Sequence, residues 1–146
     1  MKRFFQFFVI FILLTIGFQS VNAQCKGFAK KICKVELEPY IHDGNFHAAV
    51  LTEGEEAELY KTFYSDTDYR IAICGSDALP NVEFRVIYAN KNVLYSNKEH
   101  NFSRTWDFRL QSSQQLKILV KVYPSGKNAD EVVSGCVAIM FGFKEK

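Results

Sequence analysis

Along most of the chain after Pro39, apolar and polar residues alternate with a period of two. This period puts successive side chains on opposite faces of a β-strand. Turn-rich segments such as 65–68 and 124–128 separate the alternating runs. We therefore expect a mostly β protein, an antiparallel β-sandwich of about eight strands. The expected strands are 46–51, 57–63, 69–73, 82–88, 93–95, 102–110, 116–122 and 136–143.

The last of these runs is apolar on both faces, which is typical of a central strand that is covered on each side. The two faces differ in size. The bulkier one holds Val137, Ile139, Phe141 and Phe143, and the smaller one holds Cys136, Ala138, Met140 and Gly142. We expect a helix to pack on the smaller face.

That helix is predicted at about 24–35, where apolar residues recur with helical spacing. The apolar stripe comprises Cys25, Phe28, Ala29, Ile32 and Cys33, and the opposite side carries Lys26, Lys30, Lys31 and Lys34. Because a run of exposed charges on a helix is usually a solvated face, we interpret the lysines as facing solvent.

Residues 1–23 have the pattern of a cleaved secretory signal peptide. Lys2 and Arg3 precede an apolar run at 7–14 that is too short to span a bilayer, and Val21 and Ala23 suit a signal-peptidase site. A lipoprotein signal is disfavoured, because Gln24 directly precedes Cys25. We expect export to the periplasm or the extracellular space, with residues 24–146 as a single domain and no membrane span after cleavage.

Charge excludes two classes of partner for this exported form. The whole chain has 18 basic and 16 acidic residues, and cleavage removes Lys2 and Arg3, so 16 of each sign remain. Nucleic-acid binding and docking on anionic lipid both depend on a positive excess. Neither function is expected here.

The four cysteines, Cys25, Cys33, Cys74 and Cys136, are predicted to form disulfides, because export leads to an oxidising compartment. Their spacing lacks the close pairs of a zinc site. A continuous helix would hold Cys25 and Cys33 about 12 Å apart, too far for a bond. We therefore favour bonds from these two cysteines to Cys74 and Cys136, while a Cys25–Cys33 bond with Cys74–Cys136 stays open.

Candidate ligand-binding residues are few. Tyr60 and Tyr64 alternate with the apolar side chains of their strand and could stack on sugar rings, and Asp66 and Asp68 could supply two oxygen ligands from a turn. A calcium ion needs six or more oxygens, so a plain turn is the preferred interpretation of the aspartates.

No catalytic, metal or cofactor site is predicted. The chain has no G-x-S-x-G motif, and His42 and His47 flank a turn that does not fix both rings toward one point, so that a metal would need His100 or a distant carboxylate as well.

The order of segments from Leu59 to Val122 resembles the bacterial pre-peptidase C-terminal type of jelly-roll domain. The likeness lies in Phe63-Tyr64, then 69–73, 82–88 and 93–96, and later 116–122. The resemblance implies a jelly-roll fold. Family members commonly have an Asp-rich entry to the central strand, whereas this chain reads Pro80-Asn81-Val82-Glu83-Phe84, so we do not carry the ion-binding role of the family over to it. The whole exported part is also similar to small uncharacterised secreted proteins of Bacteroidetes-type bacteria.

These observations favour a non-catalytic binding module whose ligand is an unidentified protein or glycan. Two alternatives stay open, a hydrolytic or metal-dependent enzyme and an envelope protein that self-associates. Binding predicts an exposed apolar or aromatic patch, catalysis predicts a concave site with converging polar groups, and self-association predicts a sheet edge without charged residues.

Overall fold

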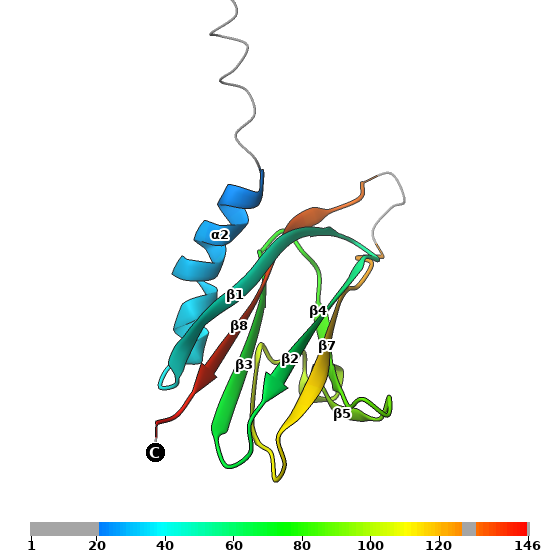
Figure 1. Cartoon of the computed structure of the whole chain (residues 1–146). Helices are drawn as coiled ribbons and strands as arrows, with labels where there is room; N and C mark the ends of the chain where they lie inside the picture. Colours follow the sequence, from blue (N-terminus) through cyan, green and yellow to red (C-terminus); the bar gives the residue numbers. More distant parts are fainter. Residues whose placement is uncertain (1–20, 127–130, 146) are drawn as a thin grey trace, which may run out of the picture.

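The computed structural model describes residues 21–126 and 131–145, and in these residues eight antiparallel strands form two four-stranded sheets (Figure 1). An N-terminal helix precedes them, which confirms the predicted fold class. The elements are α2 (Val21–Lys31), the 3-10 helix η1 (Cys33–Leu37), β1 (Ile41–Thr52), β2 (Glu56–Phe63), β3 (Asp68–Gly75), β4 (Val82–Ile87), β5 (Val93–Ser96), the 3-10 helix η2 (Asn97–His100), β6 (Thr105–Arg109), β7 (Gln114–Val122) and β8 (Ser134–Phe143).

The strand order is that of a jelly roll. Sheet A has the order β1-β8-β3-β6 and sheet B has the order β2-β7-β4-β5. Strands 1 and 8, 2 and 7, 3 and 6, and 4 and 5 are hydrogen-bonded neighbours, as in a long hairpin wrapped around a barrel. This order leaves β1 and β6 at the edges of sheet A, and β2 and β5 at the edges of sheet B.

The main core lies between the two sheets and follows the period-two pattern. In β7, the alternate residues Leu116, Ile118, Val120 and Val122 are fully buried. They face the bulkier side of β8, where Val137, Ile139 and Phe141 belong to the same apolar cluster. In β7 and β8, the period-two alternation therefore agrees with the side chains that face the interior.

A second, smaller core lies on the outer face of sheet A, under α2 and η1. Ala29, Cys33 and Leu37 pack there against Ala138 and Met140 of β8. Small side chains on this face let the helical segment approach the sheet closely. The predicted packing of the helix on the smaller face of β8 is thus confirmed.

The helical segment is divided where one helix was expected. The α-helix ends at Lys31, and residues Cys33–Leu37 continue as a 3-10 helix before Pro39. The tighter turn directs both Cys33 and Leu37 into the small core, where both are buried. Contacts with sheet A thus override the local preference for a continuous α-helix.

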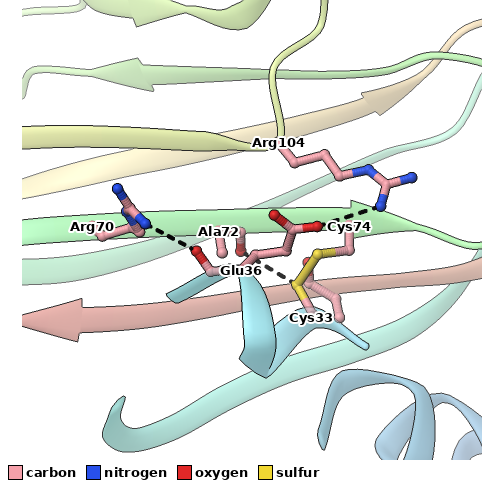
Figure 2. The surroundings of a disulfide bond; sticks show 7 residues. Cys33, Glu36, Arg70, Ala72, Cys74 and Arg104 are labelled. Atoms are coloured by element: carbon pink, nitrogen blue, oxygen red, sulfur yellow. Dashed lines mark hydrogen bonds and ion pairs between the residues drawn. A yellow bond between two sulfur atoms is a disulfide. The ribbon is translucent and has the colours of Figure 1, made fainter. Parts of the chain in front are cut away.

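Two disulfides fasten this segment to sheet A. Cys25 of α2 bonds Cys136 of β8 with a Cα–Cα distance of 5.2 Å, and Cys33 of η1 bonds Cys74 of β3 with a Cα–Cα distance of 5.7 Å. The sequence favoured bonds that join the helical segment to the strands, and the structure has one of the two pairings of that kind. Figure 2 shows the Cys33–Cys74 bond between η1 and β3.

Arg70 of β3 adds a polar clamp at the same place (Figure 2). Its guanidinium donates to the carbonyl oxygens of Glu36 at 3.3 Å and Glu38 at 2.6 Å, and it also donates to both carboxylate oxygens of Asp107 at 2.6 and 2.7 Å. The hydrogen bonds with Arg70 hold the pKa of Asp107 below its ordinary value. Carbonyl groups at the end of a helix have no hydrogen-bond partner within the helix. At the end of η1, Arg70 of β3 supplies that partner.

The predicted signal peptide falls largely on residues 1–20, which lie outside the described residues, while 21–23 form the first turn of α2. That prediction stays open. Within residues 21–126 and 131–145, no helix combines the length and the apolar character that crossing a membrane requires.

Candidate functional site

An apolar cleft opens between the two sheets at their β1 and β2 edges. These strands are edge strands of different sheets, and they diverge from the short turn that joins them (Figure 1, teal and green). The cleft has a volume of about 400 Å³. Its lining between the sheets is formed by His47, Ala49, Leu51, Ala57, Glu58, Leu59, Val120, Val137 and Ile139. Around the free edge of β1 the lining continues to Phe46, Ala48 and Lys26, on the face of sheet A that carries α2.

Residues of the main core form the floor of this cleft. Leu51, Val137 and Ile139 keep 8%, 4% and 6% of their surface exposed, whereas Ile118 at the centre of β7 keeps none. The walls carry small side chains such as Ala57, which leave the floor accessible. An apolar surface that is both concave and open is the usual form of a binding site.

An ion pair bridges the two strands further along the open edge. Lys61 of β2 donates to the carboxylate of Asp43 in β1 at 2.6 Å, and its ammonium lies 4.7 Å from the centre of the Phe141 ring. Beyond the other end, the backbone turns at Gly54, whose φ of +83° favours glycine. The cleft therefore lies between a polar bridge and a turn, and it is open along its side.

The backbone of β1 offers hydrogen-bonding groups beside the cleft. Among the described residues, its ladder pairs with β8 alone. The ladder is irregular between His42 and Phe46, but from Phe46 to Thr52 the pairing is continuous and the sequence has no charged side chain. Sheet edges are usually protected by charge, proline or a bulge, and this part of β1 has none of these.

Aromatic rings line the opposite open side of the sandwich, near β5 and β6. Trp106 stacks between Tyr95, at 4.6 Å between ring centres, and Phe108, at 4.4 Å. His100 stacks on Tyr95, with 5.1 Å between the ring centres, and extends the series by one ring. Because Trp106 has a neighbour on each face, it cannot offer a face to a sugar ring. A hollow of about 440 Å³ beside Trp106 and Phe108 is therefore less suited to glycan stacking than its composition suggests.

The two tyrosines predicted as ligand-binding residues lie away from the cleft. Tyr60 projects from the outer face of sheet B and is 58% exposed, and Tyr64 follows β2 and is 65% exposed. Neither tyrosine lines the cleft or the hollow beside Trp106 and Phe108. Their role in ligand binding stays a prediction.

Asp66 and Asp68, in contrast, are brought together around one arginine. Arg109 donates to the carbonyl oxygen of Asp66 at 3.0 Å and lies 3.6 Å from a carboxylate oxygen of Asp68. Asp66 has a φ of +59°, which suits a tight turn. This arrangement favours the turn interpretation over a calcium site, since a guanidinium already faces the oxygens.

The histidines do not converge either. His42 donates from Nε2 to the carbonyl oxygen of Asn45 at 3.0 Å, whereas His47 stands at the rim of the cleft and His100 lies on the aromatic side. In residues 21–126 and 131–145, no three side chains of His, Cys, Asp or Glu gather as metal ligands would.

Sequence reasoning missed the residues that shape the cleft. Ala49 and Ala57 are small residues at inward positions of two edge strands, and alternation alone marks such positions as core. The available signal was the pair Ala48-Ala49 in the stretch 46–52, whose other residues are larger. Only the relative position of the two sheets turns these alanines into the walls of an opening.

No protein-family model and no curated protein sequence matches this chain. Among solved structures, it is similar to the crystal structure of Aeromonas hydrophila PliG, a periplasmic lysozyme inhibitor of g-type lysozyme, with 16% identity, 66% of this chain and 84% of that chain covered, and a TM-score of 0.48. It is also similar to the solution structure of a de novo designed double-stranded β-helix, with 14% identity, 68% and 99% covered, and a TM-score of 0.34. At these values neither likeness carries an activity over to this chain.

Proposed function

We propose that this chain is a non-catalytic, exported binding module that holds an extended segment of a partner protein along the cleft between β1 and β2. The observation that carries the proposal is the cleft itself, where largely buried core residues keep a small accessible surface beside an edge strand without charged residues. An extended segment can use both features at once, because it pairs through its backbone and inserts alternate side chains.

Backbone pairing would come from β1. Between Phe46 and Thr52 this strand has a ladder partner only on the β8 side in the described residues. Addition of a strand to such an edge gives affinity through main-chain hydrogen bonds, while side-chain pockets give specificity. The partner strand would extend sheet A beyond β1.

The side-chain pocket is the floor of the cleft. A partner residue such as Val or Leu that enters between Ala49 and Ala57 would cover Leu51 and Val137. Burial of one aliphatic side chain contributes about 1.5–3 kcal/mol. Two or three such contacts contribute about 3–9 kcal/mol, and backbone pairing adds to this against an entropic cost of association of at least about 4 kcal/mol.

The chemistry at the cleft favours binding over catalysis. The titratable side chains that line it are Lys26, His47 and Glu58. Glu58 is an ion-pair partner of Lys117 at 3.3 Å, so its carboxylate is directed to the outer face of sheet B. The lining thus gives an apolar floor with separated polar groups at the rim.

Export is supported by the two disulfides, since such bonds persist in oxidising compartments and are rare in the cytosol. The periplasm or the extracellular space is therefore where we place the partner.

A designed peptide tests the proposal. The probe is a capped, fluorescein-labelled peptide of seven residues that alternates valine and threonine, titrated into the oxidised protein purified from the periplasm and followed by fluorescence anisotropy. We expect saturable binding that Ala57→Leu weakens at least ten-fold, because the added side chain fills the cleft. Ala49→Leu, at an exposed position, is a second variant in case Ala57→Leu is unstable.

Thr62→Leu is the matched control, because it adds an apolar side chain to the exposed face of the same strand. Thermal melts establish that each variant is folded. Absence of binding by the wild-type protein, or equal binding by Ala57→Leu, Ala49→Leu and Thr62→Leu, would overturn the proposal.

A further inference from the structure

The lysines of the helical segment are not distributed evenly around the cleft. Lys26 of α2 lines the cleft, and the ammonium of Lys30 lies 5.6 Å from the centre of the Phe46 ring in β1. Lys31 and Lys34 are exposed too, but they do not line the cleft. Two positive charges therefore stand beside the free edge of β1.

These charges are uncompensated in the described part of the chain. No carboxylate there lies within ion-pair distance of Lys26 or Lys30, whereas the lysines on the neighbouring sheet B are paired. Lys117 pairs with Glu58 and Lys121 pairs with Glu56 at 3.0 Å. The free charge at the rim of the cleft is thus positive and lies on the α2 side.

The geometry of a strand separates the two kinds of contact. Successive side chains of a strand added to β1 point to opposite faces of sheet A. One face of sheet A borders the cleft, and the other carries α2. One set of alternate side chains would therefore enter the cleft, and the other set would lie beside Lys26 and Lys30.

The spacing of the two lysines also fits a strand. Four residues of α-helix advance by about 6 Å, and two residues of a strand advance by about 6.6 Å. Figure 1 shows α2 running alongside β1 on the outer face of sheet A. Two acidic residues separated by one position would thus meet Lys26 and Lys30 in turn.

A second copy of this chain is the less suitable occupant. If β1 paired antiparallel with β1 of another copy, the twofold axis would be perpendicular to the extended sheet, so both α2 helices would lie on the same face. Lys26 and Lys30 of the two copies would then approach each other, and like charges at short distance repel. Although the β1 edge itself has no charged side chains, Lys26 and Lys30 beside it oppose the pairing of two copies.

We propose that the segment bound at the cleft is acidic at alternate positions, with apolar side chains between the sheets and Asp or Glu side chains beside Lys26 and Lys30. This inference rests on the proposed function and specifies the chemistry of the partner. An exposed ion pair strengthens binding by roughly two- to three-fold, so two pairs supply about four- to ten-fold.

Three peptides of equal length test the proposal with the oxidised protein at low salt. They alternate valine with glutamate, threonine or lysine. We expect the glutamate peptide to bind four- to ten-fold more tightly than the threonine peptide, and the lysine peptide to bind most weakly. In 0.5 M salt the glutamate and threonine peptides should become nearly equal, because screening weakens exposed ion pairs.

Paired charge variants locate the effect. The double substitution Lys26→Gln with Lys30→Gln should remove the preference for glutamate, whereas Lys31→Gln with Lys34→Gln, which changes net charge equally, should leave most of it. Equal effects of the two doubles would overturn the inference. If the threonine and glutamate peptides bind equally well and Ala57→Leu blocks both, the inference fails while the proposed function holds.

Two further results would each overturn the inference. If none of the three peptides binds, the proposed function fails and the inference with it. Phosphatidylglycerol vesicles form the last arm: binding to vesicles that depends on Lys26 and Lys30, without binding of any peptide, would assign the charge to a lipid surface and overturn the inference.

Discussion

Replacement of Arg70 by methionine should loosen the helical segment from sheet A. The methionine keeps most of the apolar stem and removes the guanidinium. Two carbonyl oxygens, those of Glu36 and Glu38, then lose a charged donor. The ion pair with Asp107 is lost as well, although the Asp107 side chain is 43% exposed.

The expected cost is about 2–3 kcal/mol. We assign about 1 kcal/mol to each carbonyl contact, below the usual range for charged hydrogen bonds because water can replace a donor near the surface. The ion pair contributes less than about 1 kcal/mol because its partner is solvent-exposed. For a domain of this size, the loss lowers the melting temperature by about 6–12 °C.

Thermal melts followed by circular dichroism measure the total loss, and hydrogen exchange with mass spectrometry locates it. Exchange should accelerate most in residues 33–40. Arg109→Met is the matched control, because Arg109 is 56% exposed and donates to one carbonyl, so its melting temperature should fall by less than about 3 °C. Equal losses in the two variants, or unchanged exchange at 33–40, would refute the clamp.

Three other changes probe separate features. Replacing Cys25 and Cys136 together by alanine should cost about 4–5 kcal/mol in urea denaturation, since the bond closes a loop between residues 111 positions apart. Asn97→Ala should cost about 2–4 kcal/mol in the same assay, because this buried amide accepts from the Phe84 backbone N–H and donates to two carbonyls. Asp107→Asn should reduce the loss of stability in acid, because folding lowers the pKa of Asp107, chiefly through its hydrogen bonds with Arg70. The stabilisation by the Asp107 carboxylate is complete above the unfolded pKa of about 4 and is lost as the pH falls further. Melting temperatures of both proteins from pH 7 to pH 2 measure the difference.

Much of the fold followed from local pattern. The period of two located the strands, and the unequal faces of β8 indicated correctly that its smaller face, with Ala138 and Met140, lies under the helical segment. Burial explains this success, because one buried face forces alternation in the sequence. Strand ends were less predictable. A strand was expected from residue 102, but Asn101 and Phe102 take positive φ values of 53° and 54°, which an extended strand does not allow, and β6 begins at Thr105.

The site was not predictable in the same way. Ala49 and Ala57 are neighbours across the cleft only because β1 and β2 belong to different sheets and part from each other after the turn. No periodicity records how far two sheets diverge. Tyr60 and Tyr64 were chosen for exposure, and they are exposed, but exposure alone does not make a concave surface.

Both cross-links of the molecule join the helical segment to sheet A, so in mechanical terms the protein has one reinforced wall and one unreinforced wall. A force that pulls α2 from β8 loads covalent bonds, whereas a force that parts sheet B from sheet A loads the connecting loops, the apolar contacts and the Asp43–Lys61 ion pair. The cleft can therefore widen without straining either disulfide. Lys26 and Lys30 thus lie on the disulfide-bonded side of the cleft, and the opposite side is sheet B, which neither disulfide reaches.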